Sequence, residues 1–228
     1  MVGDNLKSLY AKLPSAVKLV AVSKFHPVER LMEAYDAGQR VFGENRPQEL
    51  AAKVPLMPSD VEWHFIGHLQ TNKLKFVLPY ATMVQSVDSF HLLEAIDKWG
   101  SANGKVIDIL LELHLGAEET KHGFSEEEIL TLVRKAGEGT PSPAGVCLNS
   151  VRIRGLMGMA TNTEDEAVIE ADFARIEALF KRIRAEYPAL AETFTELSIG
   201  MSGDWPLAVK HGATMVRIGT DIFGPREY

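Results

Sequence analysis

Short apolar runs alternate with longer amphipathic segments along the chain. The first run, residues 19–22, is apolar at every position, which is typical of a strand buried on both faces of a parallel sheet. The segment after it, residues 27–37, has Leu31, Ala34 and Tyr35 on one stripe of a helix and ends at Gly38. The same alternation recurs to the C-terminus, and strands are predicted at residues 18–24, 41–45, 63–68, 83–88, 106–115, 152–159, 196–200 and 215–219.

Helices are predicted between these strands, at residues 27–37, 90–99, 126–136, 164–187 and 205–211, with shorter ones after Pro47 and before Pro79. A further helix at residues 5–13 precedes the first strand. This alternation, without a long linker, predicts a parallel sheet with right-handed crossovers. Eight repeats in 228 residues suit a closed TIM-type (β/α)8 barrel better than an open doubly wound sheet. We therefore expect residues 1–228 to form a single α/β barrel domain with an extra N-terminal helix.

Composition and charge narrow the class of protein. Apolar residues make up 46% of the chain and charged residues 24%, as in ordinary globular proteins. The net charge of -7 argues against nucleic acid as a partner, because that binding draws on clustered cations. Cys147 is the only cysteine, which excludes an intrachain disulfide and a thiolate metal cluster. No signal peptide or apolar run of about 20 residues is evident, so a cytoplasmic protein without a membrane partner is expected.

Polar residues follow the predicted strands, where a barrel of this type carries its chemistry. Lys24 stands where the first strand stops, and is either a surface residue or an amine placed in a pocket. Residues at the later strand ends are Glu44, Asn45, His68, Ser86, Asp88, His114, Met159, Ser202, Arg217 and Thr220. His64 and His68 lie on one side of a strand, but no third ligand is evident, so no metal site is predicted. No Gly-x-Gly-x-x-Gly follows the first strand, which disfavours dinucleotide binding.

The last two strands end in loops of small residues. One reads Ser198-Ile-Gly-Met-Ser-Gly-Asp204, and the other is Gly219-Thr220. Small residues let backbone N–H groups approach an anion, and a helix N-terminus adds its dipole. Two such loops favour a phosphate site. The alternative is that these glycines serve only turns and that Ser202 or Asp204 caps the next helix.

Arg217 is flanked in its strand by Val216 and Ile218, and alternation directs it to the opposite side. Two orientations remain open. An inward guanidinium in the barrel mouth needs an anion or an acceptor such as a ring nitrogen, because an unpaired buried charge is costly. An outward one would pair with a helix carboxylate.

An ordered set of motifs resembles the pyridoxal phosphate homeostasis protein family. That family is similar to the N-terminal barrel of alanine racemase without its second domain. The resemblance covers nearly the whole chain, and it rests on the set more than on any single motif. The motifs are Val20-Ala-Val-Ser-Lys24, Phe42-Gly-Glu-Asn45 with Gln48-Glu49, His64-Phe-Ile-Gly-His-Leu-Gln70 with Asn72-Lys73, Ser86-Val-Asp88, Gly200-Met-Ser202 with Asp204, and Val216-Arg-Ile-Gly219.

The resemblance implies a fold-type III barrel that holds pyridoxal 5′-phosphate (PLP). Lys24 matches the lysine that forms a Schiff base with PLP, and Asn45 matches an asparagine on the cofactor side of the pocket. Arg217 falls where an arginine faces the pyridine nitrogen. The implied phosphate-binding positions are Ser202, Gly219 and Thr220, with Met201 and Gly203 in the same loop.

These matches point to a protein that carries PLP. An arginine donates a hydrogen bond and keeps its proton, so the ring nitrogen stays unprotonated and the cofactor is a weak electron sink. With the sequence ending at Tyr228, we do not expect the second domain that supplies the opposite-face tyrosine in alanine racemase. We therefore expect a monomeric PLP homeostasis protein that stores PLP or delivers it to PLP-dependent apoenzymes, without robust catalysis.

Two other functions stay open. The first is a PLP-dependent amino-acid racemase or lyase of narrow substrate range, with Lys24 as its only base. The second is a barrel that binds a sugar phosphate and no PLP.

The chain departs from the family pattern in several loops. His114 stands where the family usually has asparagine, Arg46-Pro47 replaces an aromatic-aliphatic pair, and Ala160-Thr161 stands where proline is frequent. Lys121 fits a Glu-x-x-Lys-x-Gly pattern and resembles a second lysine that handles PLP outside the main site. The alternative for Lys121 is a solvated loop lysine. These departures affect loop contacts and leave the cofactor prediction intact.

Overall fold

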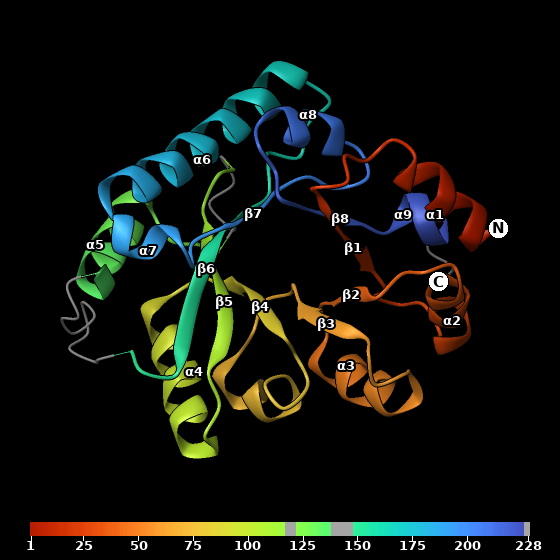
Figure 1. Ribbon diagram of the computed structural model, residues 1–228, viewed down its shortest axis with the longest axis horizontal. Helices are drawn as coiled ribbons and strands as arrows, with labels where there is room; N and C mark the ends of the chain where they lie inside the picture. The colour runs from red at the N-terminus through yellow and green to blue at the C-terminus, as the bar shows by residue number, and fades with distance from the viewer. Residues whose placement is uncertain (117–121, 138–147, 226–228) are drawn as a thin grey trace.

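Eight parallel strands close into a barrel in which each strand pairs with its neighbours in the sequence and β8 pairs with β1 (Figure 1). The structure is a computed structural model that describes residues 1–116, 122–137 and 148–225. The predicted (β/α)8 barrel is confirmed. The strands are β1 (Lys18–Val22), β2 (Val41–Glu44), β3 (Glu62–Phe65), β4 (Met83–Val87), β5 (Ile107–Leu113), β6 (Val151–Gly158), β7 (Glu196–Ser198) and β8 (Met215–Ile218).

Helices surround the barrel (Figure 1). The α-helices are α1 (Val2–Tyr10), α2 (Val28–Asp36), α3 (Pro47–Lys53), α4 (Phe90–Asn103), α5 (Glu126–Gly137), α6 (Glu166–Glu186), α7 (Pro188–Ala191), α8 (Trp205–Lys210) and α9 (Thr220–Phe223). Two 3-10 helices are η1 (Val54–Leu56) and η2 (Thr71–Phe76). The extra N-terminal helix is confirmed as α1, which packs against α2 and α9. The short helices α7 and α9 were not predicted.

Local sequence signals explain where the longer helices begin and end. Ser89 caps α4 by accepting a hydrogen bond from the Leu92 amide, and Gly104 ends that helix in the left-handed conformation. Asp165 caps α6 in the same way through the Ala167 amide. Among the described residues, no helix combines the length and the apolar character that crossing a membrane requires.

The strands end earlier than the sequence predicts, and the third strand shows why. A strand was predicted at residues 63–68, whereas β3 ends at Phe65. Gly67 packs directly on Asn45, the residue after β2, since a Cβ there would lie 2.4 Å from the Asn45 carbonyl oxygen. The chain therefore leaves the sheet at Gly67, and His68 belongs to the loop that follows.

The apolar core forms two layers around the barrel wall. Most buried apolar side chains fill the space between strands and helices. A smaller cluster fills the barrel interior and consists of Val20, Met83, Leu110, Met157 and Met215. Polar side chains also point into this interior, which positions the candidate site.

Candidate functional site

Arg217 points into the barrel, so the inward orientation is correct and the outward pairing with a helix carboxylate is wrong. Its side chain is buried, and Nη1 donates hydrogen bonds to the Ser198 carbonyl oxygen at 2.8 Å and to Ser198 Oγ at 2.6 Å. Nη2 donates to the Gly158 carbonyl oxygen at 2.9 Å. Burial lowers the pKa of Arg217 to about 10, and Glu112 and Asp204 oppose that shift. The guanidinium therefore remains a cation at neutral pH.

A chain of neutral hydrogen bonds across the barrel interior holds Arg217. Ser198 Oγ donates to Gln85 Oε1 at 2.7 Å, and Gln85 Nε2 lies 2.8 Å from His64 Nδ1. Burial lowers the pKa of His64 to about 3, so the ring is neutral and Nδ1 can accept. Across residues 1–116, 122–137 and 148–225, no carboxylate forms an ion pair with Arg217. Glu112 and Asp204 therefore act on Arg217 only through their charge, without a direct ion pair.

Glu112 is the acidic group of the mouth. It lies near the end of β5 and is buried. Burial and, to a lesser extent, the negative charge of Asp88 raise the pKa of Glu112 to about 7, with the charge of Arg217 acting in the opposite direction. Glu112 therefore exchanges its proton near neutral pH.

A buried charged cluster lies behind the turn that carries Lys24. Ser23, the residue before Lys24, donates its hydroxyl to Glu44 Oε1 at 2.7 Å. The Lys53 amine, from α3, donates to the Ser23 carbonyl oxygen at 2.9 Å and to Glu44 Oε1 at 2.6 Å. Lys24 itself stands in the turn that directly follows β1, at the carboxyl end of the barrel.

The same cluster also holds the residue after Lys24. Phe25 has a positive φ of 67°, which is uncommon for a bulky residue. Its amide donates to Glu49 Oε2 at 3.0 Å, and the Lys53 amine donates to the same oxygen at 3.2 Å. Burial alone would raise the pKa of Glu49, but the Phe25 amide and Lys53 outweigh it and lower that pKa. The backbone is thus fixed on both sides of Lys24.

The loop after β7 is folded back on itself. The Met201 amide donates to Asp204 Oδ1 at 2.5 Å, and α8 has no side-chain cap from Asp204. Asp204 thus occupies the N-cap position of α8, as the alternative expected, but its side chain makes no capping hydrogen bond to that helix. Ser202 is half-buried and Met201 is exposed. Met201, Gly203 and Asp204 line a hollow of about 370 Å³ together with residues 159–163, whereas Lys24, Asn45 and Arg217 do not line it.

The loop after β8 meets the end of β1. Gly219 precedes α9, and Thr220 is the first residue of that helix. A Cβ on Gly219 would lie 3.1 Å from the Val22 carbonyl oxygen, two residues before Lys24. The first amides of a helix have no acceptor within it, so they can bind an anion. Because Gly219 contacts Val22, Gly219 and Thr220 lie on the side of the mouth where β1 ends and Lys24 follows.

Asn45 contributes a polar atom without a partner. Its Oδ1 is buried and accepts no hydrogen bond within the described part of the chain. Buried polar atoms are almost always satisfied, so an unpaired acceptor beside the mouth indicates a missing donor.

At the positions where the chain departs from the family pattern, the residues present make contacts of their own. The Arg46 guanidinium lies 4.3 Å from the centre of the Phe25 ring and forms a 3.4 Å ion pair with Glu49. Thr161 donates its amide and its hydroxyl to Asp172 Oδ2, contacts that a proline could not reproduce in full. The His114 amide pairs with the Phe124 carbonyl. Lys121 and Cys147 lie outside the described residues.

Several residues around the site were not predicted from the sequence. Lys53 follows Glu49 by four residues in the predicted helix after Pro47, which is the spacing of an ion pair on one helix face. Gln85 interrupts an otherwise mostly apolar strand, a signal of an inward polar contact. The strand pattern of Ile107–Leu113 likewise contains Glu112 among apolar residues.

The fold and the mouth place this chain in a known class of barrels. Residues 2–227 match the family model of the alanine racemase N-terminal domain. An alanine racemase from Bartonella henselae, 15% identical, superimposes with a TM-score of 0.71 over 100% of this chain and 60% of the racemase. That similarity shows the shared fold.

Closer relatives define the family. A pyridoxal phosphate homeostasis protein of Aquifex aeolicus is 36% identical over 215 residues, which span 94% of this chain and 89% of the relative. The solved structure of PipY from Synechococcus elongatus without PLP is 37% identical, with a TM-score of 0.89 over 98% of this chain and 100% of PipY. The PLP-bound form of PipY has a TM-score of 0.85, with 98% and 100% coverage at 36% identity. The chain belongs to the pyridoxal phosphate homeostasis protein family.

Proposed function

We propose that this chain binds PLP in the barrel mouth and serves intracellular PLP homeostasis by storing the cofactor and delivering it to PLP-dependent apoenzymes. The observation that carries the proposal is Arg217, a buried cation held by neutral acceptors and directed at the mouth. The names of the relatives and the PLP-bound structure of PipY support it. We further propose that the chain acts as a single-domain, cytoplasmic monomer.

The residues of the mouth fit PLP. The loops of Met201, Ser202, Gly219 and Thr220 would receive the phosphate through backbone amides and hydroxyls. Arg217 would donate to the pyridine nitrogen, and the unpaired Asn45 Oδ1 would accept a hydrogen bond from the cofactor. PLP supplies an aldehyde that condenses with an amine to a Schiff base with loss of water, and Lys24 is the proposed amine. That reaction requires the amine in its neutral form.

The chemistry of Arg217 favours a carrier over an enzyme. A guanidinium keeps its proton, so the ring nitrogen beside it stays unprotonated and withdraws electrons weakly. Carbanion chemistry at a bound amino acid is disfavoured for that reason.

A second function, an amino-acid racemase or lyase of narrow range, is favoured by Glu112 alone. Its pKa of about 7 suits a general acid or base at neutral pH. Incubation with single L-amino acids in deuterated water distinguishes the two functions. The carrier function predicts negligible exchange of the α-proton. Rapid exchange that Lys24→Ala abolishes would establish the enzyme instead.

Addition of PLP to the purified protein tests the proposal itself. The expected result is a near-visible absorption band that Lys24→Ala removes and that Lys210→Ala, on the exposed end of α8, retains. Transfer of the bound PLP to an added apoenzyme then tests delivery. A protein that develops no such band and binds a sugar phosphate in the same loops would overturn the proposal.

A further inference from the structure

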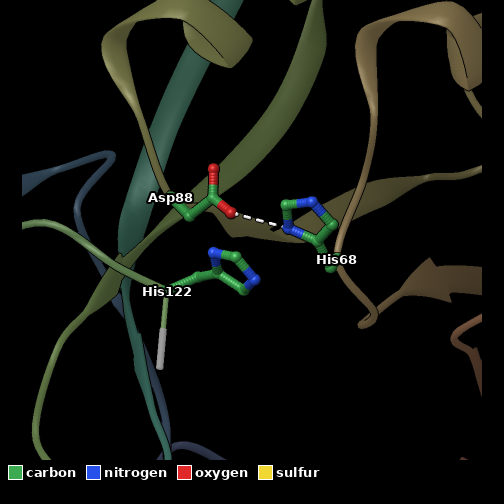
Figure 2. Close-up of side chains that lie close together, drawn as sticks. All are labelled: His68, Asp88 and His122. Carbon is green, nitrogen blue, oxygen red and sulfur yellow. Dashed lines mark hydrogen bonds and ion pairs between the residues drawn. The ribbon is translucent and has the colours of Figure 1, made fainter. Parts of the chain in front are cut away.

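Three side chains with metal-binding atoms meet at the rim of the mouth, where Figure 2 shows His68, Asp88 and His122 facing one another. His68 Nδ1 lies 2.9 Å from Asp88 Oδ2. The rings of His68 and His122 are stacked, with centres 4.1 Å apart and planes inclined by 18°. One potential ligand atom from each residue lies within 4.8 Å of the other two.

The scaffold fixes His68 and Asp88. Ser86 Oγ donates to the Gly67 carbonyl oxygen at 2.5 Å, which ties the His68 turn to β4. Asp88 follows β4, and its Oδ1 accepts a hydrogen bond from Ser89 Oγ at 3.0 Å. Oδ2 is thereby left to face His68. The Asp88 side chain is only 7% exposed, whereas that of His68 is 47% exposed, so the carboxylate lies at the base of the cluster.

The segment after β5 brings His122 to the same place. The Phe124 amide donates to the Glu112 carbonyl oxygen at 2.8 Å, and the His114 amide donates to the Phe124 carbonyl oxygen at 3.0 Å. Gly123 has a φ of 131°, and a Cβ on it would lie 2.7 Å from the His114 nitrogen. The chain thus returns to pair with the end of β5 directly after His122.

An ion pair between His68 and Asp88 explains two of the three residues and leaves the stacked His122 without a role. Two imidazole rings and one carboxylate that converge in this way form a typical set of metal ligands, since histidine is the commonest metal ligand in proteins. We propose that His68, Asp88 and His122 bind a divalent transition-metal ion of the zinc class. Imidazole nitrogen and carboxylate oxygen suit Zn²⁺, whereas Mg²⁺ and Ca²⁺ prefer oxygen donors alone.

The geometry requires a small adjustment. Ligand atoms about 2.0–2.2 Å from one Zn²⁺ lie roughly 3.3 Å apart in a tetrahedral site. The distance between His68 Nδ1 and Asp88 Oδ2 is already near that value. The exposed His122 ring can turn so that its ligand nitrogen comes equally close to the ligand atoms of His68 and Asp88. Three protein ligands leave one position for water or an anion.

This site is distinct from a pair of His64 and His68. His64 and His68 do not converge, because His64 is buried against Gln85. The third ligand, His122, comes from a loop that the sequence pattern does not connect to His68. The site lies on the side of β3, β4 and β5, whereas the proposed phosphate loops follow β7 and β8. Metal binding can therefore fail without affecting the proposed function, and the reverse also holds.

Calorimetry on the untagged full-length protein tests the proposal, with Zn²⁺ as the probe and the PLP-free and PLP-loaded forms compared. We expect one Zn²⁺ per chain in both forms and no comparable binding of Mg²⁺. His68→Ala, Asp88→Asn and His122→Ala should each weaken binding at least about 100-fold, because even outer-shell partners of a metal are worth 10–100-fold. His91→Ala, an exposed histidine on α4, should leave binding unchanged.

Cobalt provides a second readout. Co²⁺ added to the wild-type protein should produce visible absorption bands of a low-coordinate site, and each of the three variants should lose them while keeping the circular dichroism of the folded barrel. The absence of Zn²⁺ binding by the wild-type protein would overturn the proposal. Retention of wild-type affinity by any of the three variants would also overturn the assignment of ligands.

Discussion

The barrel holds Lys24 and Arg217, the two basic residues of the proposed site, in opposite ways. The backbone around Lys24 is fixed from outside the barrel wall by a charged cluster of Glu44, Glu49 and Lys53. Arg217 is fixed from inside the barrel by the neutral groups Ser198 and Gln85. The outer cluster pairs its carboxylates directly with the Lys53 amine, whereas the groups that hold Arg217 are neutral, and Glu112 and Asp204 act on Arg217 through their charge without an ion pair. Neutral hydrogen-bond partners can thus fix the position of Arg217 without placing a carboxylate in contact with its guanidinium.

The largest effect is expected from breaking the outer cluster. Lys53→Met leaves Glu44 buried without its cation, and removal of one partner of a buried pair costs about 3–5 kcal/mol. Denaturant unfolding measures the loss. Lys210→Met, on the exposed end of α8, should change stability by no more than about 0.5 kcal/mol. A loss below about 1 kcal/mol for Lys53→Met would contradict the role of the cluster.

The buried carboxylate of Glu112, near Arg217, should make the stability of the barrel depend on pH. Because its folded-state pKa is raised from 4.5 to about 7, the folded protein binds this proton more tightly than the unfolded chain, and the stability it contributes falls as the pH rises from 4.5 to 7. Glu112→Gln removes that loss, so the variant should exceed the wild type by roughly 3 kcal/mol at pH 8 and match it near pH 4. Unfolding curves at both pH values check this.

The matched control for Glu112 is Glu170→Gln, an exposed carboxylate on α6. It should show the same small difference from the wild type at both pH values. A Glu112→Gln variant that is no more stable than the wild type at pH 8 would show that its carboxylate is compensated in the mouth.

A smaller effect is expected from the neutral inner chain. Ser198→Ala removes a hydroxyl that accepts from Arg217 and donates to Gln85, and an unsatisfied buried group costs about 1–3 kcal/mol. The variant should also shift the absorption maximum of bound PLP, because the guanidinium loses one of its fixed acceptors. Restoration of the wild-type spectrum by Ser198→Thr would assign the shift to the hydroxyl. An unchanged spectrum in Ser198→Ala would refute the positioning role.

The smallest effect is expected at Arg46, where the chain departs from its family. Arg46→Ala removes the contact with the Phe25 ring and the ion pair with Glu49, and an exposed cation–π contact contributes about 0.5–1 kcal/mol. Denaturant midpoints detect a change of that size. Arg46→Lys should retain part of it. If Arg46→Ala lowered the free energy of unfolding as much as Lys53→Met does, the stability of the charged cluster would depend on the exposed Arg46, contrary to this prediction.

The sequence predicted the repeating pattern of the barrel better than the details of its mouth. The apolar runs identified all eight strands, because a strand buried on both faces is apolar along its length. The predicted strand end at residue 68 was wrong, because Gly67 packs against Asn45, the residue after β2, and a local sequence pattern does not encode a contact between two segments. Period-two alternation placed the Arg217 side chain on the face opposite Val216 and Ile218, but it did not say whether that face is the inside or the outside of the barrel. The hydrogen bond of Arg217 to Ser198 shows that it is the inside.

Contacts between distant segments explain the rest. Lys53 and Ser23 are thirty residues apart, and their hydrogen bond depends on how α3 packs on the barrel. The stack of His68 on His122 depends in the same way on the return of the segment after β5. A local pattern carries no signal for such contacts, whereas the family resemblance already implied the cofactor positions at Lys24 and Arg217.

Borohydride reduction of the PLP-loaded protein, followed by peptide mapping, tests the central claim most directly. Reduction converts a Schiff base into a stable adduct on the lysine that held the cofactor. We predict a single modified residue, Lys24, with Lys53 and Lys121 unmodified. An adduct on Lys53 or Lys121 in place of Lys24, or no adduct at all, would contradict the account.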